Sequence, residues 1–387
     1  MVAPFVVLGD LHLTRASPPD VSRDLAAVLA AHAGRRVVFD GDLFDWSADA
    51  ARASKGTAAL ADVLGRNPIA RAALGDHVGK GGELWLVSGN HDADLGAEGF
   101  RAALCDALDL AESARARVRV TPWFFRDGGV HVEHGHLFDP DNAPAHPLVV
   151  GEPSLGVHFV EQFIAPAGAH RYLNANDRTP LDLFLASFAW YGPRAPYVIY
   201  RYFYTAFTAL ARSGPLYRAA GEGEIGARRV ADFAEAEGVD AAMAAQLVGL
   251  GARPTLESLA ATFSRLYLDR VAATVALTSG LGAAAAGRLR LGAMLGAAGA
   301  LAMSTSWALG KDRYGGSVPA RLEAGAAEVA KATGAEMVIF GHTHREADSE
   351  AYANTGSFAF PAKGRGRPYL VVDCAAGGRP RAERRYG

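Results

Sequence analysis

The chain has 387 residues, and its 39 lysines and arginines nearly balance 41 aspartates and glutamates, for a formal net charge of −2. This length suits a core domain with a large insertion better than one ordinary domain. Basic residues cluster only near the end, at residues 379–385, so the charge balance disfavours nucleic acid as a partner. The two cysteines, Cys105 and Cys374, indicate neither a disulfide framework nor a thiolate zinc site, and they fit a reducing cytoplasm.

The chain begins with an apolar run rather than with the basic segment of a signal peptide, and residues 5–8 predict a first buried strand. Comparable runs of three or four apolar residues predict further buried strands. They lie at residues 37–39, 84–87, 130–132 and 337–340. Residues 350–360 and 368–374 have the pattern of closing strands.

Alanine- and leucine-rich helical patterns separate the first three runs. Residues 20–33 are one example, with Asp20 as the expected N-cap and Gly34 just past the end. Strands that alternate with helices predict βαβ units and an α/β fold with a largely covered sheet. Because open α/β sheets bind ligands beyond the carboxyl ends of their strands, polar residues that follow the runs are candidates for a functional site.

Residues 145–330 have a different composition, rich in alanine and helical in pattern, with many aromatic residues between positions 184 and 207. Two interpretations stay open for this aromatic segment. It forms either the hydrophobic core of an insertion or an oily lining, in which case the insertion is a substrate lid or a groove for a lipid-like group.

Two uncharged stretches follow, at residues 271–287 and 291–309, with Arg288 and Arg290 between them. The second stretch has the length of a membrane span. Its small-residue face consists of Gly292, Gly296 and Ala300. A spanning hairpin would carry both arginines to the side opposite the catalytic domain, against the tendency of such residues to stay cytoplasmic. A closely packed soluble helix pair and a membrane-inserted pair therefore both remain open.

Five short polar blocks stand at the ends of the predicted strands. They are Asp10-Leu11-His12, Gly41-Asp42-Leu43-Phe44-Asp45, Gly89-Asn90-His91-Asp92, His134-Gly135-His136 and Gly341-His342-Thr343-His344. Taken singly, each block has a plain structural explanation, such as a turn that favours Asn, Asp or Gly. Taken together, the ordered set of carboxylates, amide and imidazoles predicts a metal site. Nitrogen and oxygen donors without thiolate suit Mn, Fe, Zn or Co.

The five blocks resemble the signature of the calcineurin-like metallophosphoesterase superfamily, D-x-H, G-D-x-x-D, G-N-H-[DE], H and G-H-x-H, with every element present. This resemblance implies a layered α/β/β/α sheet core and the hydrolysis of phosphate esters. We expect residues 1–144 and 331–387 to form the core. Residues 145–330 would be a mainly helical insertion that serves as a cap or associates with a membrane.

Two divalent cations about 3.5 to 4 Å apart need one anionic ligand between them, and Asp42 is the candidate bridge. Asp10 and His12 stand at positions i and i+2 of a segment expected to be extended, so their side chains would point the same way and reach one metal together. The resemblance adds His344 to this first metal. It assigns three residues to the second metal: Asn90, His134 and His342.

The resemblance places His91 beside the scissile phosphate, oriented by Asp45. An imidazole held by a carboxylate keeps its proton and direction, so it can stabilise charge or protonate a leaving oxygen. An N-cap role is the alternative for Asp45. We expect Asp92 to support the site structurally. His136 is a candidate for substrate contact, with a supporting or surface role as its alternative, and no other substrate-binding residue is predicted.

The implied mechanism is in-line attack on phosphorus by a hydroxide shared between the two metals, whose charge lowers the pKa of bound water from about 15.7 towards roughly 7. The predicted enzyme is a phosphatase or phosphodiesterase, with manganese among the expected metals. Its substrate would be a phosphorylated small molecule or a lipid-linked phosphate. We expect it in the cytoplasm, with peripheral attachment to or insertion in the inner membrane as an open alternative.

Within the superfamily, two segments look most like the UDP-2,3-diacylglucosamine diphosphatases: Asp10-Leu11-His12-Leu13 and Gly41-Asp42-Leu43-Phe44-Asp45-Trp46. The chain departs from that branch at His91, where the branch has arginine, and at His136, where it has aspartate. Two further classes remain as alternatives. One is an inactive membrane or lipid-binding scaffold that retains the fold, and the second is a nuclease, which the charge balance disfavours.

Overall fold

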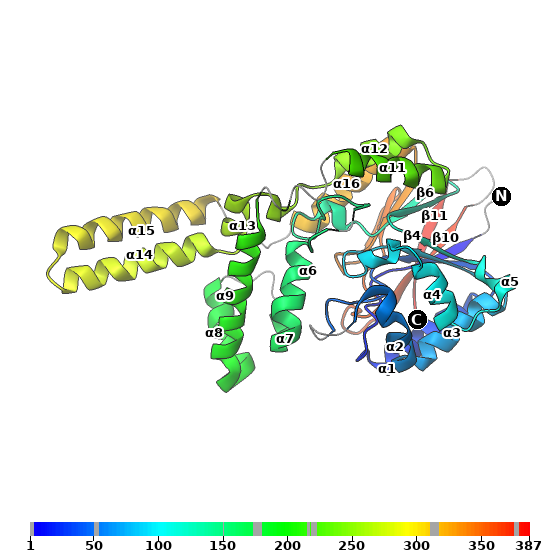
Figure 1. Ribbon diagram of the computed structural model, residues 1–387, viewed down its shortest axis with the longest axis horizontal. Helices are drawn as coiled ribbons and strands as arrows, with labels where there is room; N and C mark the ends of the chain where they lie inside the picture. The colour runs from blue at the N-terminus through cyan, green and yellow to red at the C-terminus, as the bar shows by residue number, and fades with distance from the viewer. Residues whose placement is uncertain are drawn as a thin grey trace. The chain divides into compact units, whose positions relative to one another are not determined.

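The computed structural model describes residues 4–49, 54–149, 151–172, 180–214, 217, 223–309, 317–374 and 379–387 (Figure 1). The described residues fall into two compact units. The first unit takes in those between Met1 and Pro166, between Ala220 and Pro254, and between Val318 and Gly387. The second takes in those between Ala167 and Ala219 and between Thr255 and Ser317.

The first unit contains a six-stranded sheet in the order β11-β10-β1-β2-β3-β4. Its parallel strands are β1 (Phe5–Leu8), β2 (Arg36–Asp40), β3 (Glu83–Val87) and β4 (Val118–Thr121). Two late strands complete it in antiparallel pairing: β10 (Pro368–Asp373) and β11 (Arg381–Tyr386). All four residues of β1 are buried, as expected for a strand covered on both faces.

A second, five-stranded sheet has the order β5-β6-β7-β9-β8. Its strands are β5 (Phe124–Asp127), β6 (Val130–Glu133), β7 (Met337–Phe340), β8 (Ala347–Asp348) and β9 (Tyr352–Asn354). The parallel pairing of β6 with β7 joins segments that lie about two hundred residues apart in the chain. The predicted strand over residues 350–360 is thus much shorter in the structure.

The two sheets pack face to face. Val7 of the first sheet and Val132 and Ile339 of the second belong to one buried cluster. The rings of Phe5 and Phe125 meet edge to face across this layer, with centroids 5.5 Å apart. This packing excludes water from both inner faces and makes the sandwich the centre of the unit.

Helices cover the outer faces of the sandwich. The first sheet carries α1 (Pro19–Ala31), α2 (Leu60–Arg66), α3 (Pro68–Gly79), α4 (Phe100–Ala107) and the short α5 (Glu112–Arg115). The second sheet carries α11 (Glu224–Glu237), α12 (Ala241–Leu250) and α16 (Ser317–Thr333). The α/β/β/α layering predicted from the sequence is therefore confirmed. Two short helices follow the sandwich: α6 (Leu155–Phe159) and α7 (Ala165–Ala167).

The N-terminus predicted for the first helix is wrong. The residue before α1 is Pro18, not Asp20, and Asp20 lies in the first turn. Pro19 occupies N1, and a proline suits this position because its ring presets φ and its missing N–H is not needed there. Asp20 instead accepts a hydrogen bond from the guanidinium of Arg367 at 2.6 Å.

The sequence predicts a core of residues 1–144 and 331–387 and an insertion of residues 145–330. This division places α11, α12 and most of α16 in the insertion. In the structure these helices belong to the first unit. Phe233 of α11 packs on Trp123 and Phe124, with ring centroids 5.6 and 5.0 Å apart. The amphipathic pattern of such helices reveals a buried face but not the surface that covers it.

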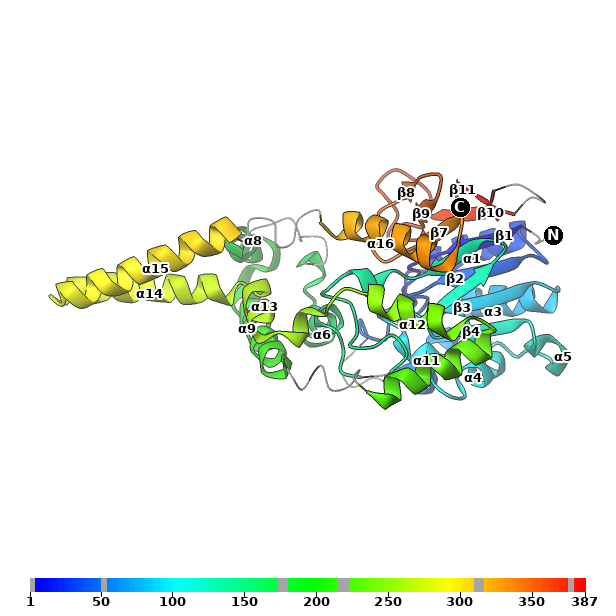
Figure 2. The same ribbon diagram turned by 90° about the horizontal axis from the view of Figure 1, so that it is seen from above.

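The second unit is helical. Its elements are α8 (Pro180–Tyr191), α9 (Ala195–Arg212), α13 (Leu259–Arg265), α14 (Leu268–Ala285) and α15 (Leu289–Leu309). Both views show α14 and α15 as an antiparallel pair joined by a tight turn (Figures 1 and 2). By length and composition, one helix among the described residues could cross a membrane, and it is α15.

Candidate metal centre

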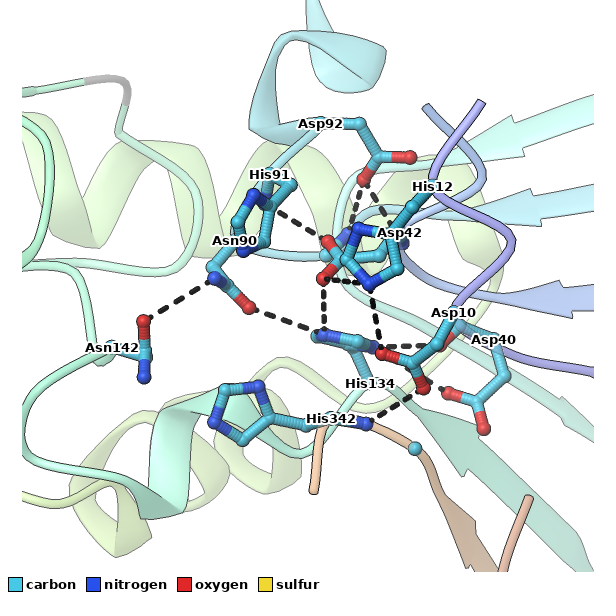
Figure 3. A network of polar contacts seen from close by, with 12 residues as sticks. Asp10, His12, Asp40, Asp42, Asn90, His91, Asp92, His134, Asn142 and His342 are labelled. Atoms are coloured by element: carbon cyan, nitrogen blue, oxygen red, sulfur yellow. Dashed lines mark hydrogen bonds and ion pairs between the residues drawn. The ribbon is translucent and has the colours of Figure 1, made fainter. Parts of the chain in front are cut away.

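The five polar blocks meet in the first unit. β1, β2 and β3 run parallel, so the blocks that follow them emerge at one edge of the first sheet. β6 and β7 run parallel in the second sheet and bring the His134 and His342 blocks to the same place. Figure 3 shows side chains from the first four blocks pointing toward one another, with the backbone N–H of His342 donating to Asp10.

The backbone at this meeting point is unusual. Seven described non-glycine residues have a positive φ, and five of them are predicted metal ligands. They are Asp10 (55°), His12 (46°), Asp42 (50°), His342 (68°) and His344 (55°). Each such conformation costs about 1 kcal/mol or more and persists only where the surroundings impose it, as happens at functional sites.

These angles correct one expectation. β1 ends at Leu8, and the Asp10–His12 segment is not extended. The alternation rule for strands therefore does not explain why the two side chains share a site. Two left-handed residues and backbone hydrogen bonds orient them instead: the amide of Asp10 donates to the carbonyl of Gly41 at 3.3 Å, and that of His12 to Asp42 at 2.9 Å.

The first group of donor atoms belongs to Asp10, His12 and His344, whose ligand atoms lie within 4.8 Å of one another. Nε2 of His12 and Nε2 of His344 are 3.1 Å apart. Oδ1 of Asp10 lies 3.1 Å from Nε2 of His344. Burial alone would raise the pKa of Asp10, but His344 and then His12 outweigh it and hold this pKa well below its usual value. Two imidazoles and an ionised carboxylate form a donor set that fits a divalent transition metal.

The second group consists of Asp10, Asp42 and His134. Nδ1 of His134 lies 2.8 Å from the backbone carbonyl of Asp40, which leaves Nε2 directed at the site. This Nε2 lies 3.1 Å from Oδ2 of Asp42 and 3.2 Å from Oδ1 of Asn90. Burial would lower the pKa of His134, but the surrounding carboxylates, Asp42 first, raise it to about 10.

The third group consists of His12, Asp42 and His91. Asp42 is thus common to two groups, and its Oδ1 also accepts the backbone N–H of His91 at 2.9 Å. Burial would raise the pKa of Asp42, yet His134 and His91 lower it, so the carboxyl stays ionised. An ionised carboxylate between two donor sets is what a pair of neighbouring cations requires.

Asp45 holds two imidazoles at once. Its Oδ1 lies 2.9 Å from Nδ1 of His91, and its Oδ2 lies 3.3 Å from Nδ1 of His12. The hydroxyl of Ser47 donates to Oδ1 of Asp45 and lies 2.6 Å from Nδ1 of His91. The amide of Ala48 also donates to Asp45, but a turn and not a helix follows it. The alternative of an N-cap alone therefore does not describe this residue.

A family model of calcineurin-like phosphoesterases matches residues 3–243 of the chain. The chain belongs to this family. It is accordingly a hydrolase that acts on phosphate esters, and the three donor groups support its dependence on metal. A search of curated proteins finds none that matches. The matched range holds the first four blocks, whereas His342 and His344 lie beyond it and join the site through the second sheet.

Two glycines of this phosphoesterase let the backbone approach candidate metal-binding side chains closely. A Cβ at Gly89 would lie 2.1 Å from Oδ1 of Asp42 and 2.6 Å from the Asp42 amide nitrogen. At Gly41, with φ of 83°, a Cβ would lie 2.5 Å from the ring of His134. Real Cβ contacts are not that short, so both blocks need glycine for space as well as for conformation.

Asp92 ties two blocks of the phosphoesterase together. Its carboxylate accepts the backbone N–H groups of Gly89 at 2.7 Å, Phe44 at 3.2 Å and Asp42 at 3.3 Å. Burial, followed by the charge of Asp42, raises the pKa of Asp92 to about 7. These three bonds fix the Asp42 and Asn90 loops against each other, which is the structural role expected for Asp92.

Asp139 and Asn142 belong to the site although the sequence did not point to them. Oδ2 of Asp139 lies 3.0 Å from Nε2 of His342 and accepts from Nδ2 of Asn142 at 2.7 Å. Oδ1 of Asn142 accepts from Nδ2 of Asn90 at 3.3 Å. This loop therefore links Asn90 with His342. Asp and Asn are common in turns, so Asp139-Pro140-Asp141-Asn142 carried no signal of its own.

Two more residues lie beside the donor groups. The ring of His136 lies 5.4 Å from that of His134, and burial together with His134 and His342 holds the pKa of His136 well below its usual value. The side chain of Phe360 is 60% exposed, and its ring lies 5.7 Å from the rings of His12 and His344. Phe360, which sequence reasoning missed, offers an apolar wall at this edge of the site.

Proposed function

We propose that the chain hydrolyses phosphoesters with two divalent metal ions of the Mn, Fe, Zn or Co type. The observation that carries this proposal is the overlap of the donor groups, in which Asp10 and Asp42 each belong to two of three sets. Seven residues would hold the metals: Asp10, His12, Asp42, Asn90, His134, His342 and His344. When bound, the cations neutralise charge on the phosphate and make water at the site more acidic.

His91 and Asp45 would manage a proton during the reaction. Because Asp45 holds Nδ1 of His91, the other ring nitrogen is free to face a phosphate oxygen. From there it can stabilise developing charge or donate a proton to the leaving oxygen. His91 also appears among the donor groups, so a ligand role is the competing assignment that the test below separates.

Phe360 supports a substrate with an organic group next to the phosphate, since an exposed aromatic ring beside the donor groups can pack against it. The narrower assignment, a UDP-2,3-diacylglucosamine-type diphosphatase acting on a lipid-linked substrate, rests on the Asp10–Leu13 and Gly41–Trp46 blocks. The same proposal includes manganese as the metal, a phosphodiester as the scissile bond and the cytoplasm as the compartment. An inactive scaffold is disfavoured, because a chain without chemistry has no need of strained ligand residues.

A metal-supplemented screen of pure protein tests the function. Aryl phosphate monoesters, aryl phosphate diesters and a UDP-sugar lipid would be compared with Mn²⁺, Fe²⁺, Zn²⁺ and Co²⁺. Asp42→Ala should lose both metal and turnover, whereas Asp76→Ala, at an exposed carboxylate on α3, should retain them. A wild-type protein that binds no stoichiometric metal under any loading condition would refute the proposal.

The role of His91 needs a separate variant. His91→Asn should retain the metals and lose roughly 10² to 10⁴ in rate, as expected for a lost proton donor. A His91→Asn protein without metal would instead make His91 a ligand. Metal content by mass spectrometry and turnover of the aryl diester distinguish the two outcomes.

A further inference from the structure

The α14–α15 hairpin of the second unit has an apolar outer surface. Between residues 271 and 309 the only charged side chains are Arg288 and Arg290, which lie at and just after the turn. Large apolar side chains are exposed on both helices. They include Val275 (58%), Leu281 (73%), Met294 (71%) and Leu301 (71%). A helix that covers a soluble core has a charged face as well, and between residues 271 and 309 this pair has only Arg288 and Arg290, at its turn.

The larger apolar side chains are exposed because the two helices pack too closely to hold them between their backbones. A Cβ at Gly280 would lie 2.8 Å from the Gly296 nitrogen, and one at Gly292 would lie 2.8 Å from the Gly280 carbonyl oxygen. A Cβ at Gly299 would lie 2.8 Å from the carbonyl oxygen of Ala273. The backbones are thus already in contact, and the larger side chains can only point outward.

Several polar groups of the hairpin form hydrogen bonds within it. At the turn, where Gly287 has φ of 78°, the amide of Arg288 donates to Ala283 at 2.8 Å and that of Gly287 to Ala284 at 3.0 Å. On the exposed side of α14, the hydroxyl of Thr278 donates to the carbonyl of Thr274 at 3.0 Å. Internal pairing of this kind is what a solvent without hydrogen-bonding groups demands.

The same unit offers aromatic and basic residues on α9. Tyr197, Tyr200 and Phe207 are exposed, and the guanidinium of Arg201 lies 5.2 Å from the ring centroid of Tyr204. α13 packs against both α9 and α14, so these residues belong to the body that carries the hairpin. Amphipathic aromatic rings and arginines are typical of the boundary between lipid and water.

We propose that the α14–α15 hairpin inserts into a lipid bilayer with its turn leading. α15 has 21 residues, a length of about 31 Å, which matches a hydrocarbon core of about 30 Å. Arg288 and Arg290 would then reach the far headgroups, against the cytoplasmic bias of arginine, and their guanidinium groups would bind phosphate there. Lying flat on the membrane would require a strongly charged face along the helices, which this hairpin lacks between residues 271 and 309.

A buried core helix and an interface between two copies of the chain both fit α15 less well. The core helix of a soluble protein is mostly buried, yet only 17% of an apolar 18-residue segment of α15 is buried. A second copy of the chain would cover one side of the hairpin, whereas Leu281, Met294 and Leu301 show that both helices expose apolar groups. Insertion into a bilayer does not depend on the proposed hydrolysis.

Vesicle flotation of the full chain tests the inference. The wild type should float with neutral phosphatidylcholine vesicles and with vesicles containing phosphatidylglycerol, and it should resist high-salt and alkaline carbonate washes. The triple variant Leu281→Glu, Met294→Glu, Leu301→Glu should float less by tenfold or more, since a single carboxylate in the hydrocarbon core disfavours insertion by roughly a hundredfold. The matched control carries glutamate at exposed apolar positions outside the hairpin: Ile69, Ile225 and Leu259. It should float like the wild type, with unchanged circular dichroism in both variants.

Four results would overturn the inference. They are failure of the wild type to float, flotation of the triple variant equal to that of the wild type, binding only to phosphatidylglycerol vesicles with release by high salt, and a vesicle-free oligomer that the triple variant dissociates. The third result would show attachment by charge alone, and the fourth would make the hairpin an interface between copies. Turnover of the aryl diester is measured separately, so a failed hydrolysis assay leaves the membrane result intact.

Discussion

Replacing Gly89 by alanine should disable the site through one methyl group. The added Cβ would lie 2.1 Å from Oδ1 of Asp42, whereas ordinary contacts of this kind exceed 3 Å, so the carboxylate or its loop must move by about 1 Å. A displacement of about 1 Å in a catalytic group costs on the order of 10² in rate, which corresponds to about 2.7 kcal/mol of transition-state stabilisation. We therefore expect kcat for an aryl phosphate diester to fall about a hundredfold, together with a loss of bound metal.

The matched control is Gly65→Ala in α2. A Cβ there meets nothing within 4 Å, and alanine favours a helix over glycine by about 0.5 to 1 kcal/mol. This control should keep full activity and melt at a slightly higher temperature. Turnover and metal content of Gly89→Ala equal to those of the wild type would show that the close approach of the two loops is not what positions Asp42.

Two further variants test the support of the site and of the fold. Asp139→Ala should weaken metal binding by roughly 10- to 100-fold, because His342 loses the carboxylate that orients its ring, and unchanged affinity in a calorimetric titration would contradict this. Burial lowers the pKa of His77, so as pH falls below about 6.5 the unfolded chain takes up a proton before the folded one does, and the stability that neutral His77 contributes at higher pH is lost. Urea unfolding at about pH 7.5 and about pH 5.5 should show a smaller pH-dependent loss for His77→Gln than for the wild type; equal losses would exclude this role.

Short-range patterns of apolar residues predicted most of the strands and helices. The apolar run at residues 5–8 coincides with β1, and the run at residues 337–340 coincides with β7, because a buried strand needs apolar side chains on both faces. Helix α1 was predictable from its period, but its start was misplaced, since both an Asp20 cap and a Pro19 at the first position are acceptable at a helix N-terminus. The assignment of α11 to the sandwich was out of reach, because no local pattern names the partner of an apolar face.

The candidate site was predictable as a set of residues and not as a geometry. Motif order brought Asp42 and His134 to attention, but the left-handed backbone of Asp10 and His12 depends on contacts made by other loops. Ser47 and Asp139 have ordinary sequence surroundings, and only the folded chain places Asp139 beside a histidine 203 positions away.

The sheet order also constrains how the molecule is made. β6 has its parallel neighbour only when Met337–Phe340 has been synthesised, and β1 lacks its antiparallel neighbour until Pro368–Asp373 follows. The apolar hairpin therefore emerges from the ribosome while both sheets are still unfinished and before the candidate ligands His342 and His344 have emerged. During that interval the nascent chain exposes unpaired strand edges together with an apolar helix pair. This combination is prone to aggregation unless a chaperone or a lipid surface shields it.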